Sequence, residues 1–278
     1  MEALVKSIEN NAKRAIKTNE GDYINEDGLL VCGRCNTPKQ GRYEMPFGTV
    51  MPYILCKCEK EKHDKKKAER ERAEFLEKVK RMRRLGFPDA EMERWTFAVD
   101  DHANERVSSI ARNYVEHFDK MRKEGKGLLF YGPCGTGKSF TAACIANALV
   151  DKGYPCMMTK FSRLTNTLQG MYDGKQKYID SLNDFSLLVI DDLAAERDTE
   201  YMGEIVYDII DSRYRAGLPL IVTTNLTSQE LKNPADIRKQ RIYSRLFDMT
   251  IPVAVDGADR RKQGLRDSFD EYKQLLGL

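Results

Sequence analysis

A glycine-rich segment of eight residues limits what this chain can fold into more than any other feature. It reads Gly132-Pro133-Cys134-Gly135-Thr136-Gly137-Lys138-Ser139 and has the spacing G-x-x-x-x-G-K-[ST]. Residues 127–131 before it form a short apolar run, and residues 140–150 after it are rich in alanine, with Gly153 placed to end a helix. This order of buried strand, glycine loop and helix is the one that the motif requires around a phosphate group.

The residue types in this loop indicate a nucleotide triphosphate such as ATP. Glycines allow successive backbone N–H groups to point inward at phosphates, and the following helix directs its positive end toward them. Lys138 adds an ammonium group, and the Ser139 hydroxyl is a ligand for Mg²⁺. We therefore expect residues 132–139 to bind the nucleotide.

Two later strands end in polar side chains that complete such a site. An apolar run leads into Asp191 and Asp192, and another leads into Asn225. We expect Asp191 to bind the Mg²⁺, Asp192 to orient or deprotonate the attacking water, and Asn225 to hold that water. Because Asp192 stands where many hydrolytic enzymes of this type have the longer Glu, slow ATP hydrolysis is expected.

Strand patterns alternate with helical patterns along the second half of the chain. Short apolar runs typical of buried strands occupy residues 155–160, 187–190, 218–224 and 251–255. The alternation predicts an α/β domain in which a parallel sheet carries helices on both faces. We place this domain at residues 86–278.

Four of the seven cysteines cluster near the N-terminus. Cys32 and Cys35 form a C-x2-C pair, and after twenty residues Cys56 and Cys58 form a C-x-C pair. Four thiolates suit the tetrahedral coordination of Zn²⁺, so the spacing predicts a small structural zinc module. The second pair is tighter than the usual C-x2-C, which leaves His63 as an alternative fourth ligand.

The remaining N-terminal sequence predicts two helices around this module. Leu4, Ile8, Ala12 and Ile16 form a narrow apolar stripe, and we assign this helix and the zinc module to residues 1–58. Residues 59–85 are predicted to be a charged connecting helix. Within it, residues 59–84 contain no Gly or Pro and carry 12 Lys and Arg against 7 Asp and Glu. Its last turns place four apolar side chains on one face that should pack against another element: Phe75, Leu76, Val79 and Met82.

The composition favours a soluble cytoplasmic protein. Charged residues make up 32% of the chain, and no apolar run is long enough to suggest a membrane span or a signal peptide. An odd number of cysteines favours a reducing compartment, and we expect Cys134, Cys144 and Cys156 to behave as small, partly buried hydrophobic residues. The net charge of +3 is too small to indicate nucleic acid by itself.

Several arginines follow the last motifs. Asn233-Pro234 is predicted to begin a helix that carries Arg238, Arg241 and Arg245 on one face. An arginine in such a place can reach the γ-phosphate of a neighbouring subunit. Arg260-Arg261, after the last strand, is a further candidate for nucleotide contact.

In this order of motifs the chain resembles the AAA+ initiator and helicase-loader group, most of all the DnaC/DnaI-type loaders, which are close to the transposition helper ATPase IstB. The resemblance covers residues 87–270. It rests on the glycine loop, Asp191-Asp192, Asn225, Ser244-Arg245-Leu246 and Asp259-Arg260-Arg261. A second resemblance is to the N-terminal zinc module of some Gram-positive and phage loaders. It rests on the first cysteine pair, the residues Asn-Thr-Pro-Lys-Gln that follow it, and the later C-x-C pair.

This resemblance implies an ATP-dependent loader that binds a DnaB-type replicative helicase and places it on single-stranded DNA, with AAA+ domains that associate side by side. It implies Asn225 as sensor 1, Arg245 as an arginine finger acting in trans, and Arg261 as sensor 2. Thr96-Phe97 would lie near the adenine. Contacts to single-stranded DNA would come from Lys160, Phe161 and Arg163.

Two other functions are compatible with parts of the sequence. The main alternative is an IstB-like transposition helper, a nucleotide-gated DNA-binding adaptor, although helpers of this kind generally lack the cysteine pattern. A small-molecule kinase with a phosphate loop is disfavoured, because it gives Asn225 and Arg245 no role and the sequence offers no acceptor pocket or lid.

Overall fold

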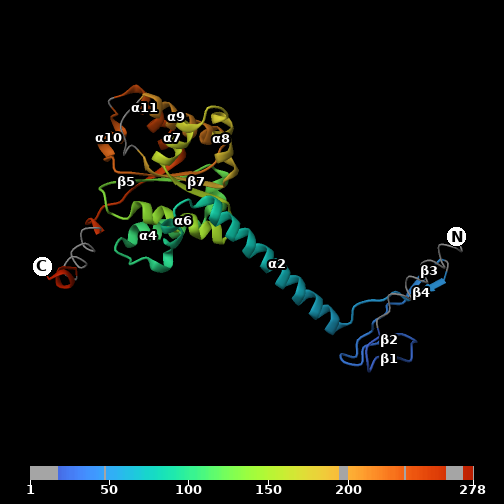
Figure 1. Ribbon diagram of the computed structural model, residues 1–278. Coiled ribbons are helices and arrows are strands. Elements are labelled where there is room, and N and C mark those ends of the chain that lie inside the picture. Colours follow the sequence, from blue (N-terminus) through green and yellow to red (C-terminus); the bar gives the residue numbers. More distant parts are fainter. Residues whose placement is uncertain (1–17, 47, 194–199, 235, 261–271, 278) are drawn as a thin grey trace. The chain divides into compact units, whose positions relative to one another are not determined.

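The computed structural model (Figure 1) describes residues 18–46, 48–193, 200–234, 236–260 and 272–277. It divides into an N-terminal unit, residues 1–76, and a C-terminal unit, residues 77–278, and each is described by itself. The helix expected around Leu4, Ile8, Ala12 and Ile16 lies outside the described residues.

Five parallel strands form the sheet of the C-terminal unit. They lie in the order β6-β7-β8-β5-β9, and every neighbouring pair is parallel. The strands are β5 (Gly127–Tyr131), β6 (Cys156–Lys160), β7 (Leu187–Leu193), β8 (Leu220–Thr224) and β9 (Thr250–Ala254). The sequence prediction of a parallel sheet is confirmed.

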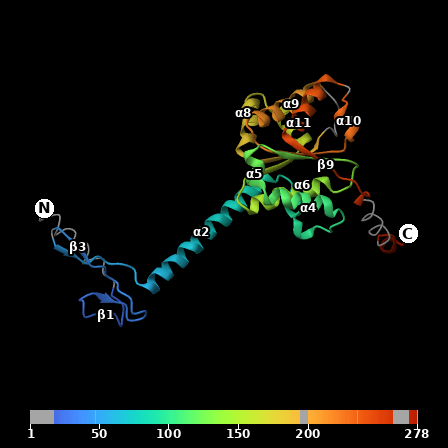
Figure 2. The same cartoon turned by 180° about the vertical axis from the view of Figure 1, so that it is seen from behind.

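Helices cover both faces of this sheet (Figures 1 and 2). On one face lie α4 (Glu105–Glu116) and α6 (Lys138–Asp151), and on the other α7 (Phe161–Gly170), α9 (Glu200–Arg215) and α11 (Ile237–Met249). The shorter elements are α3 (Ala90–Arg94), α5 (Phe118–Lys123), α8 (Lys175–Ser181), α10 (Ser228–Lys232), η1 (Phe97–Val99) and η2 (Leu182–Asp184). The predicted layered α/β architecture is therefore confirmed.

Burial on both faces explains why the strands read as continuous apolar runs. Along β5, Leu128 and Phe130 belong to the core under α4 and α6, whereas Leu129 belongs to the core on the opposite face. Successive strand side chains point to opposite faces, so each residue of a doubly covered strand must be apolar. Only the strand ends are free to carry polar chemistry.

One helix, α2 (Lys57–Gly86), covers the predicted charged segment and joins the two units. Val79 and Met82 are buried in the core with α4 and α6, as expected, but Phe75 and Leu76 are exposed. The last turns of α2 thus belong with the C-terminal unit. No described helix combines the length and the apolar character needed to cross a bilayer.

Helix α11 begins later than the sequence suggested. Asn233 is the residue that ends α10, and α11 starts at Ile237 with Asp236 as its N-cap. The Asp236 carboxylate accepts a hydrogen bond from the Arg238 backbone N–H at 2.8 Å. The prediction that Asn233-Pro234 starts this helix was wrong, because the acid that caps the helix lies two residues after the proline.

Before α2, the described residues of the N-terminal unit contain two short hairpins and a buried lysine. β1 (Tyr23–Ile24) pairs with β2 (Leu30–Val31), and β3 (Tyr43–Met45) pairs with β4 (Gly48–Val50), both antiparallel. The Lys39 side chain has no exposed surface and lies 2.7 Å from Asp22 and 3.3 Å from Glu59. Burial disfavours its charge, but the hydrogen bonds to the two carboxylates outweigh burial and raise the pKa of Lys39.

We predict that Arg213→Met lowers the free energy of unfolding of the C-terminal unit by about 2 to 4 kcal/mol. The buried Arg213 guanidinium donates to the Leu182 carbonyl at 3.1 Å and twice to the Pro219 carbonyl, and methionine would leave both carbonyls without a donor. Urea unfolding followed by circular dichroism measures the change. The exposed Arg215→Met is the control on the same helix and should change stability by less than about 1 kcal/mol; equal losses would contradict the prediction.

Candidate functional site

A cleft of about 540 Å³ lies where strands β5 to β8 of the C-terminal unit end. Its lining comprises residues 134–140 of the glycine loop, the strand-end residues Lys160, Asp191, Asp192, Thr223 and Asn225, and Glu91, Trp95 and Arg260. The carboxyl edge of a parallel sheet is where folds of this kind bind ligands. Most of the sequence-predicted nucleotide residues are therefore brought together in one place.

Backbone geometry in the glycine loop matches the sequence prediction. Gly132, Gly135 and Gly137 have positive φ angles of 135°, 76° and 95°, which disfavour other residues. At Gly135 a Cβ atom would also overlap the Asp259 carboxylate. The Lys138 ammonium donates to the Gly132 carbonyl at 2.8 Å and the Pro133 carbonyl at 2.6 Å, so it is held within the loop.

The two carboxylates lie at an irregularity between β7 and β8. The register of the pair shifts between Ile190 and Leu193, and Asp192 has a φ of 61°, in the left-handed region. The Thr223 hydroxyl donates to the buried Asp191 carboxylate at 2.6 Å and accepts from the Asp192 backbone N–H at 2.9 Å. Asp191 is thus held inside, whereas the Asp192 side chain is exposed to the cleft.

Asn225 approaches the second carboxylate. Its side-chain amide donates to Asp192 Oδ1 at 2.9 Å. An amide and a carboxylate joined in this way can both contact one water molecule that lies beside them. Together with Ser139 and Asp191, which offer oxygen ligands suited to Mg²⁺, the donor set fits a magnesium nucleotide.

The C-terminal arginines are divided between the cleft and its surroundings. Arg260 lines the cleft, and its guanidinium lies 5.8 Å from the Phe140 ring and pairs with Asp101. Arg261 lies outside the described residues. Arg245, on α11, is not part of the cleft lining: it donates to the Tyr207 hydroxyl at 2.8 Å and pairs with Asp211.

Trp95 occupies the cleft wall where the sequence placed Thr96-Phe97. Its ring lies 6.3 Å from that of Phe140, and it lines the cleft. Phe97 instead packs beneath Arg112, whose guanidinium is 4.6 Å from the ring centre. Trp95 and Glu91 were missed as site residues, because α3 precedes the glycine loop by about forty residues and no local motif marks it.

The proposed DNA-contact residues separate in the structure. Phe161 is buried in the core on the face of the sheet that α7, α9 and α11 cover. Its prediction as a stacking ring was wrong, because its side chain packs in this core. Arg163 pairs with Asp89 at 2.7 Å. Lys160 lines the nucleotide cleft, and its place as the last residue of a strand at the ligand-binding edge was the signal that could have identified it.

Among the three cysteines outside the N-terminal cluster, Cys144 and Cys156 are buried as expected, but Cys134 is exposed in the glycine loop. The expectation of partial burial was wrong for Cys134, because a loop that must open onto phosphates cannot cover its own side chains.

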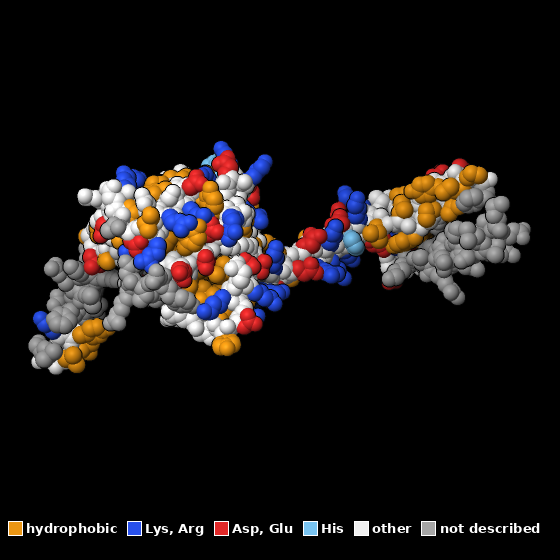
Figure 3. Space-filling model, turned by 90° about the horizontal axis from the view of Figure 1, so that it is seen from above, with side chains coloured by type: hydrophobic (Ala, Val, Ile, Leu, Met, Phe, Trp, Pro, Cys, Tyr) orange, Lys and Arg blue, Asp and Glu red, His pale blue; other side chains and the backbone are white. Residues whose placement is uncertain are grey.

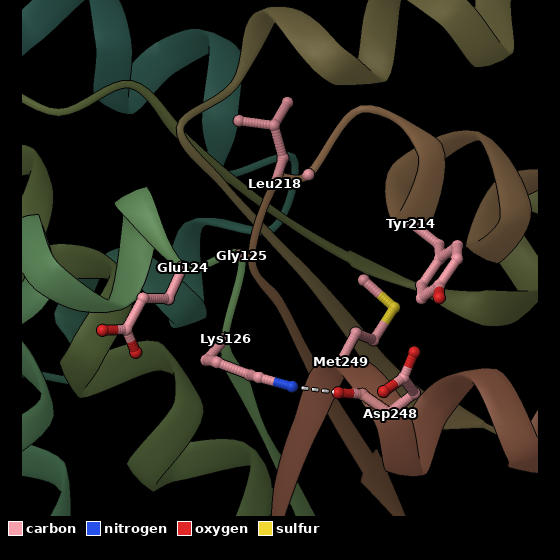
Figure 4. A pocket seen from close by; sticks show the side chains of 8 residues that line it. Glu124, Gly125, Lys126, Tyr214, Leu218, Asp248 and Met249 are labelled. Carbon is pink, nitrogen blue, oxygen red and sulfur yellow. Dashed lines mark hydrogen bonds between the residues drawn. The ribbon is translucent and has the colours of Figure 1, made fainter.

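A second pocket of about 170 Å³ lies at the opposite edge of the sheet, where β5 and β8 begin (Figure 4). The Lys126 ammonium donates to the Asp248 carbonyl there, and a hydrogen bond to the Asp248 carboxylate raises the pKa of Tyr214. These contacts join the start of β5 to the ends of α9 and α11. Because these polar groups bond to one another, we assign this pocket a structural role.

The four N-terminal cysteines converge in the N-terminal unit. The Sγ atoms of Cys32, Cys35, Cys56 and Cys58 all lie within 4.8 Å of one another, with 3.7 Å between Cys32 and Cys58 and 3.4 Å between Cys56 and Cys58. Sulfurs about 2.3 Å from a tetrahedral Zn²⁺ would be separated by about 3.8 Å. The donor set therefore fits a closed structural zinc site.

Thr37 connects the two cysteine pairs. Its hydroxyl accepts from the Lys57 backbone N–H at 2.9 Å and contacts Cys35 Sγ at 3.0 Å, and this contact lowers the pKa of Cys35 to about 6. His63 takes no part in the cluster: its exposed ring pairs with Asp64.

Comparison with known proteins gives a consistent family. The model of the IstB-like ATP-binding proteins matches residues 58–264. The replicative helicase loader DnaI of Bacillus subtilis is 27% identical over 161 residues, which are 54% of this chain and 51% of that protein. A Mycobacterium tuberculosis protein described as ATP-binding and in an insertion sequence is 24% identical over 142 residues, 49% of this chain and 56% of that protein.

A crystal structure of DnaI has the same fold as the C-terminal unit. It matches with a TM-score of 0.52 and 22% identity, covering 62% of this chain and 96% of that structure. This likeness identifies the layered sheet as the AAA+ phosphate-loop fold. The chain spans about half the length of the curated relatives it matches.

We predict that the purified chain holds one Zn²⁺ and that Cys56→Ser removes it. A tetrahedral site with three thiolates loses much of its affinity, and the N-terminal unit depends on the metal because its apolar core is small. Elemental analysis after dialysis measures the zinc content. Cys144→Ser, a buried cysteine of the C-terminal unit, is the matched control and should keep the metal; zinc-free wild-type protein would refute the prediction.

Proposed function

The chain belongs to the family of IstB-like ATP-binding proteins, and from this premise we propose that it is an ATP-dependent loader that binds a DnaB-type replicative helicase and places it on single-stranded DNA when replication begins. The observation that carries the proposal is the combination of an ATP cleft with a separate cysteine-held unit in one chain. The similarity to the replicative helicase loader DnaI supports the same choice.

In this proposal the cleft binds and hydrolyses ATP. The glycine loop and Lys138 bind the phosphates, Ser139 and Asp191 bind Mg²⁺, and Arg260 supplies a further cation. Asp192 activates the attacking water and Asn225 orients it, a division of roles that their 2.9 Å hydrogen bond supports. Arg261 retains its proposed role as sensor 2.

Arg245 acts in a neighbouring subunit. Its position outside its own cleft, with a side chain that is still partly exposed beside α9, supports a role in trans. Self-association of the AAA+ domains would then complete each ATP site with an arginine from the next chain, so that hydrolysis requires assembly.

The N-terminal unit supplies the helicase contact. Six large hydrophobic side chains are exposed among its described residues before α2: Tyr23, Ile24, Tyr43, Met45, Ile54 and Leu55. Figure 3 shows hydrophobic side chains gathered on the described part of this unit. Exposed apolar groups gathered in this way mark a protein-binding surface, because a partner that covers them removes their apolar area from water.

Single-stranded DNA binds along the insertion between β6 and β7. With Phe161 buried, the aromatic ring available there is Tyr172, which is fully exposed between α7 and α8 and is followed by Lys175 and Lys177. A stacking ring with adjacent cations suits a strand bound without sequence preference.

A second candidate function is that of an IstB-like transposition helper, in which the partner is a transposase and ATP acts mainly as a switch. The similarity to the insertion-sequence protein favours it. The cysteine cluster favours the loader. Copurification with a DnaB-type helicase, compared with copurification with a transposase, distinguishes the two.

Arg245→Ala is expected to lower ATP hydrolysis at least about tenfold while leaving ATP affinity nearly unchanged, because the arginine serves the neighbour's site. A mixture of Arg245→Ala with Lys138→Ala should regain part of the activity, since the second variant still supplies Arg245 to an intact cleft. ATPase rates and nucleotide titration measure both effects, with Arg238→Ala as control. An equal loss of ATP affinity in Arg245→Ala would rule out action in trans.

Replacing Ile24 and Tyr43 together by Glu should abolish copurification with a DnaB-type helicase, because charges on an apolar interface must be desolvated. Unchanged zinc content and ATPase activity would show that the variant folds. Ile237→Glu, an equally exposed position of the C-terminal unit, should keep the helicase bound. Helicase binding that persists in the double variant would exclude this surface.

A further inference from the structure

Lys160, which the sequence predicted as a contact to single-stranded DNA, lines the nucleotide cleft, and none of the roles proposed for that cleft uses it. It is the last residue of β6 and the residue before α7, and its register partner on the neighbouring strand is Asp191. The backbone there is well fixed, because β6 is paired with β7 and the first side chain of α7, Phe161, is buried. The Lys160 side chain therefore starts from a rigid point at the cleft edge.

Among the residues that the structure describes, three cationic side chains line the cleft, and two of them have partners within the protein. Lys138 donates to two loop carbonyls, and Arg260 pairs with Asp101. Lys160 has no hydrogen bond or ion pair from its ammonium to any residue that the structure describes, and its side chain is exposed. A cation left without a partner in a cleft built for phosphates is available for a charge-assisted hydrogen bond to one.

The order of the strands indicates which phosphate Lys160 can reach. The glycine loop follows β5, and the strands then run β8, β7 and β6 away from it. Asn225, Asp192 and Lys160 follow these three strands in turn. Lys160 therefore lies beyond the carboxylates, on the side of the cleft opposite the loop that holds the inner phosphates.

We propose that the Lys160 ammonium binds the terminal phosphate of a bound nucleoside triphosphate and so makes the cleft discriminate ATP from ADP. The inference rests on the proposed placement of the nucleotide in this cleft. Because α7 begins at the next residue, the same contact joins the insertion between β6 and β7 to the third phosphate.

Equilibrium titration of the full chain with Mg²⁺ and either ADP or a non-hydrolysable ATP analogue tests the inference. Lys160→Ala should weaken binding of the analogue at least about tenfold, the worth of one charge-assisted hydrogen bond, and change ADP affinity less than about twofold. Lys160→Arg should restore most of the preference for the analogue. Lys123→Ala removes the same charge from the exposed end of α5, outside the cleft lining, and should alter neither affinity.

Two outcomes would overturn the inference. One is an equal loss of both affinities, which would indicate a general effect on the cleft; the other is no loss of either. If either outcome came with a lower hydrolysis rate, Lys160 would act on Asp192 and the attacking water and not on the terminal phosphate. Lys138→Ala separates this inference from the proposed function: if that variant still binds both nucleotides normally, the nucleotide does not lie in this cleft.

Discussion

The two hydrogen bonds of the Thr223 hydroxyl are the interaction on which the rest of the site depends. By donating to Asp191 and accepting from the Asp192 backbone, one hydroxyl on β8 fixes both carboxylates of β7 at the point where their strand register shifts. The shift turns consecutive residues to different environments, one buried and one open to the cleft. Adjacent carboxylates can then serve different purposes, one as a metal ligand and the other beside a water molecule.

Much of this arrangement could be predicted from the sequence because it is local or periodic. The glycine loop specifies its own backbone, and apolar runs specify strands whose ends meet at one edge of the sheet. The register shift at Asp192 could not be predicted, because it depends on a hydroxyl 31 residues away. The prediction that Phe161 stacks on DNA was wrong for a related reason. An aromatic residue beside a cation has the same sequence pattern whether its ring is buried or exposed, and only the packing of α7 decides between the two.

In the N-terminal unit, too, the spacing of residues along the chain allowed a prediction, whereas contacts between distant residues did not. The positions of the four cysteines predicted their convergence, because a single metal site imposes that spacing. Lys39 gave no such signal, yet its buried ammonium joins Asp22 before the first cysteine pair to Glu59 after the second. A buried lysine is tolerated only when carboxylates surround it. The tertiary fold brings these carboxylates to the lysine, and no local motif marks them.

The contacts of Arg245 within its own chain are compatible with a role in a neighbouring site. Its side chain is 30% exposed, and its partner Asp211 also holds Arg215 at 2.8 Å, so Asp211 keeps a cation when Arg245 leaves. Exchange of a partly exposed ion pair costs on the order of 1 kcal/mol. An arginine that stabilises phosphoryl transfer contributes a factor of about 10³ to 10⁵ in rate, equivalent to roughly 4 to 7 kcal/mol. The contacts to Tyr207 and Asp211 are therefore weak enough to be exchanged for a phosphate, as the proposed role of Arg245 in trans requires.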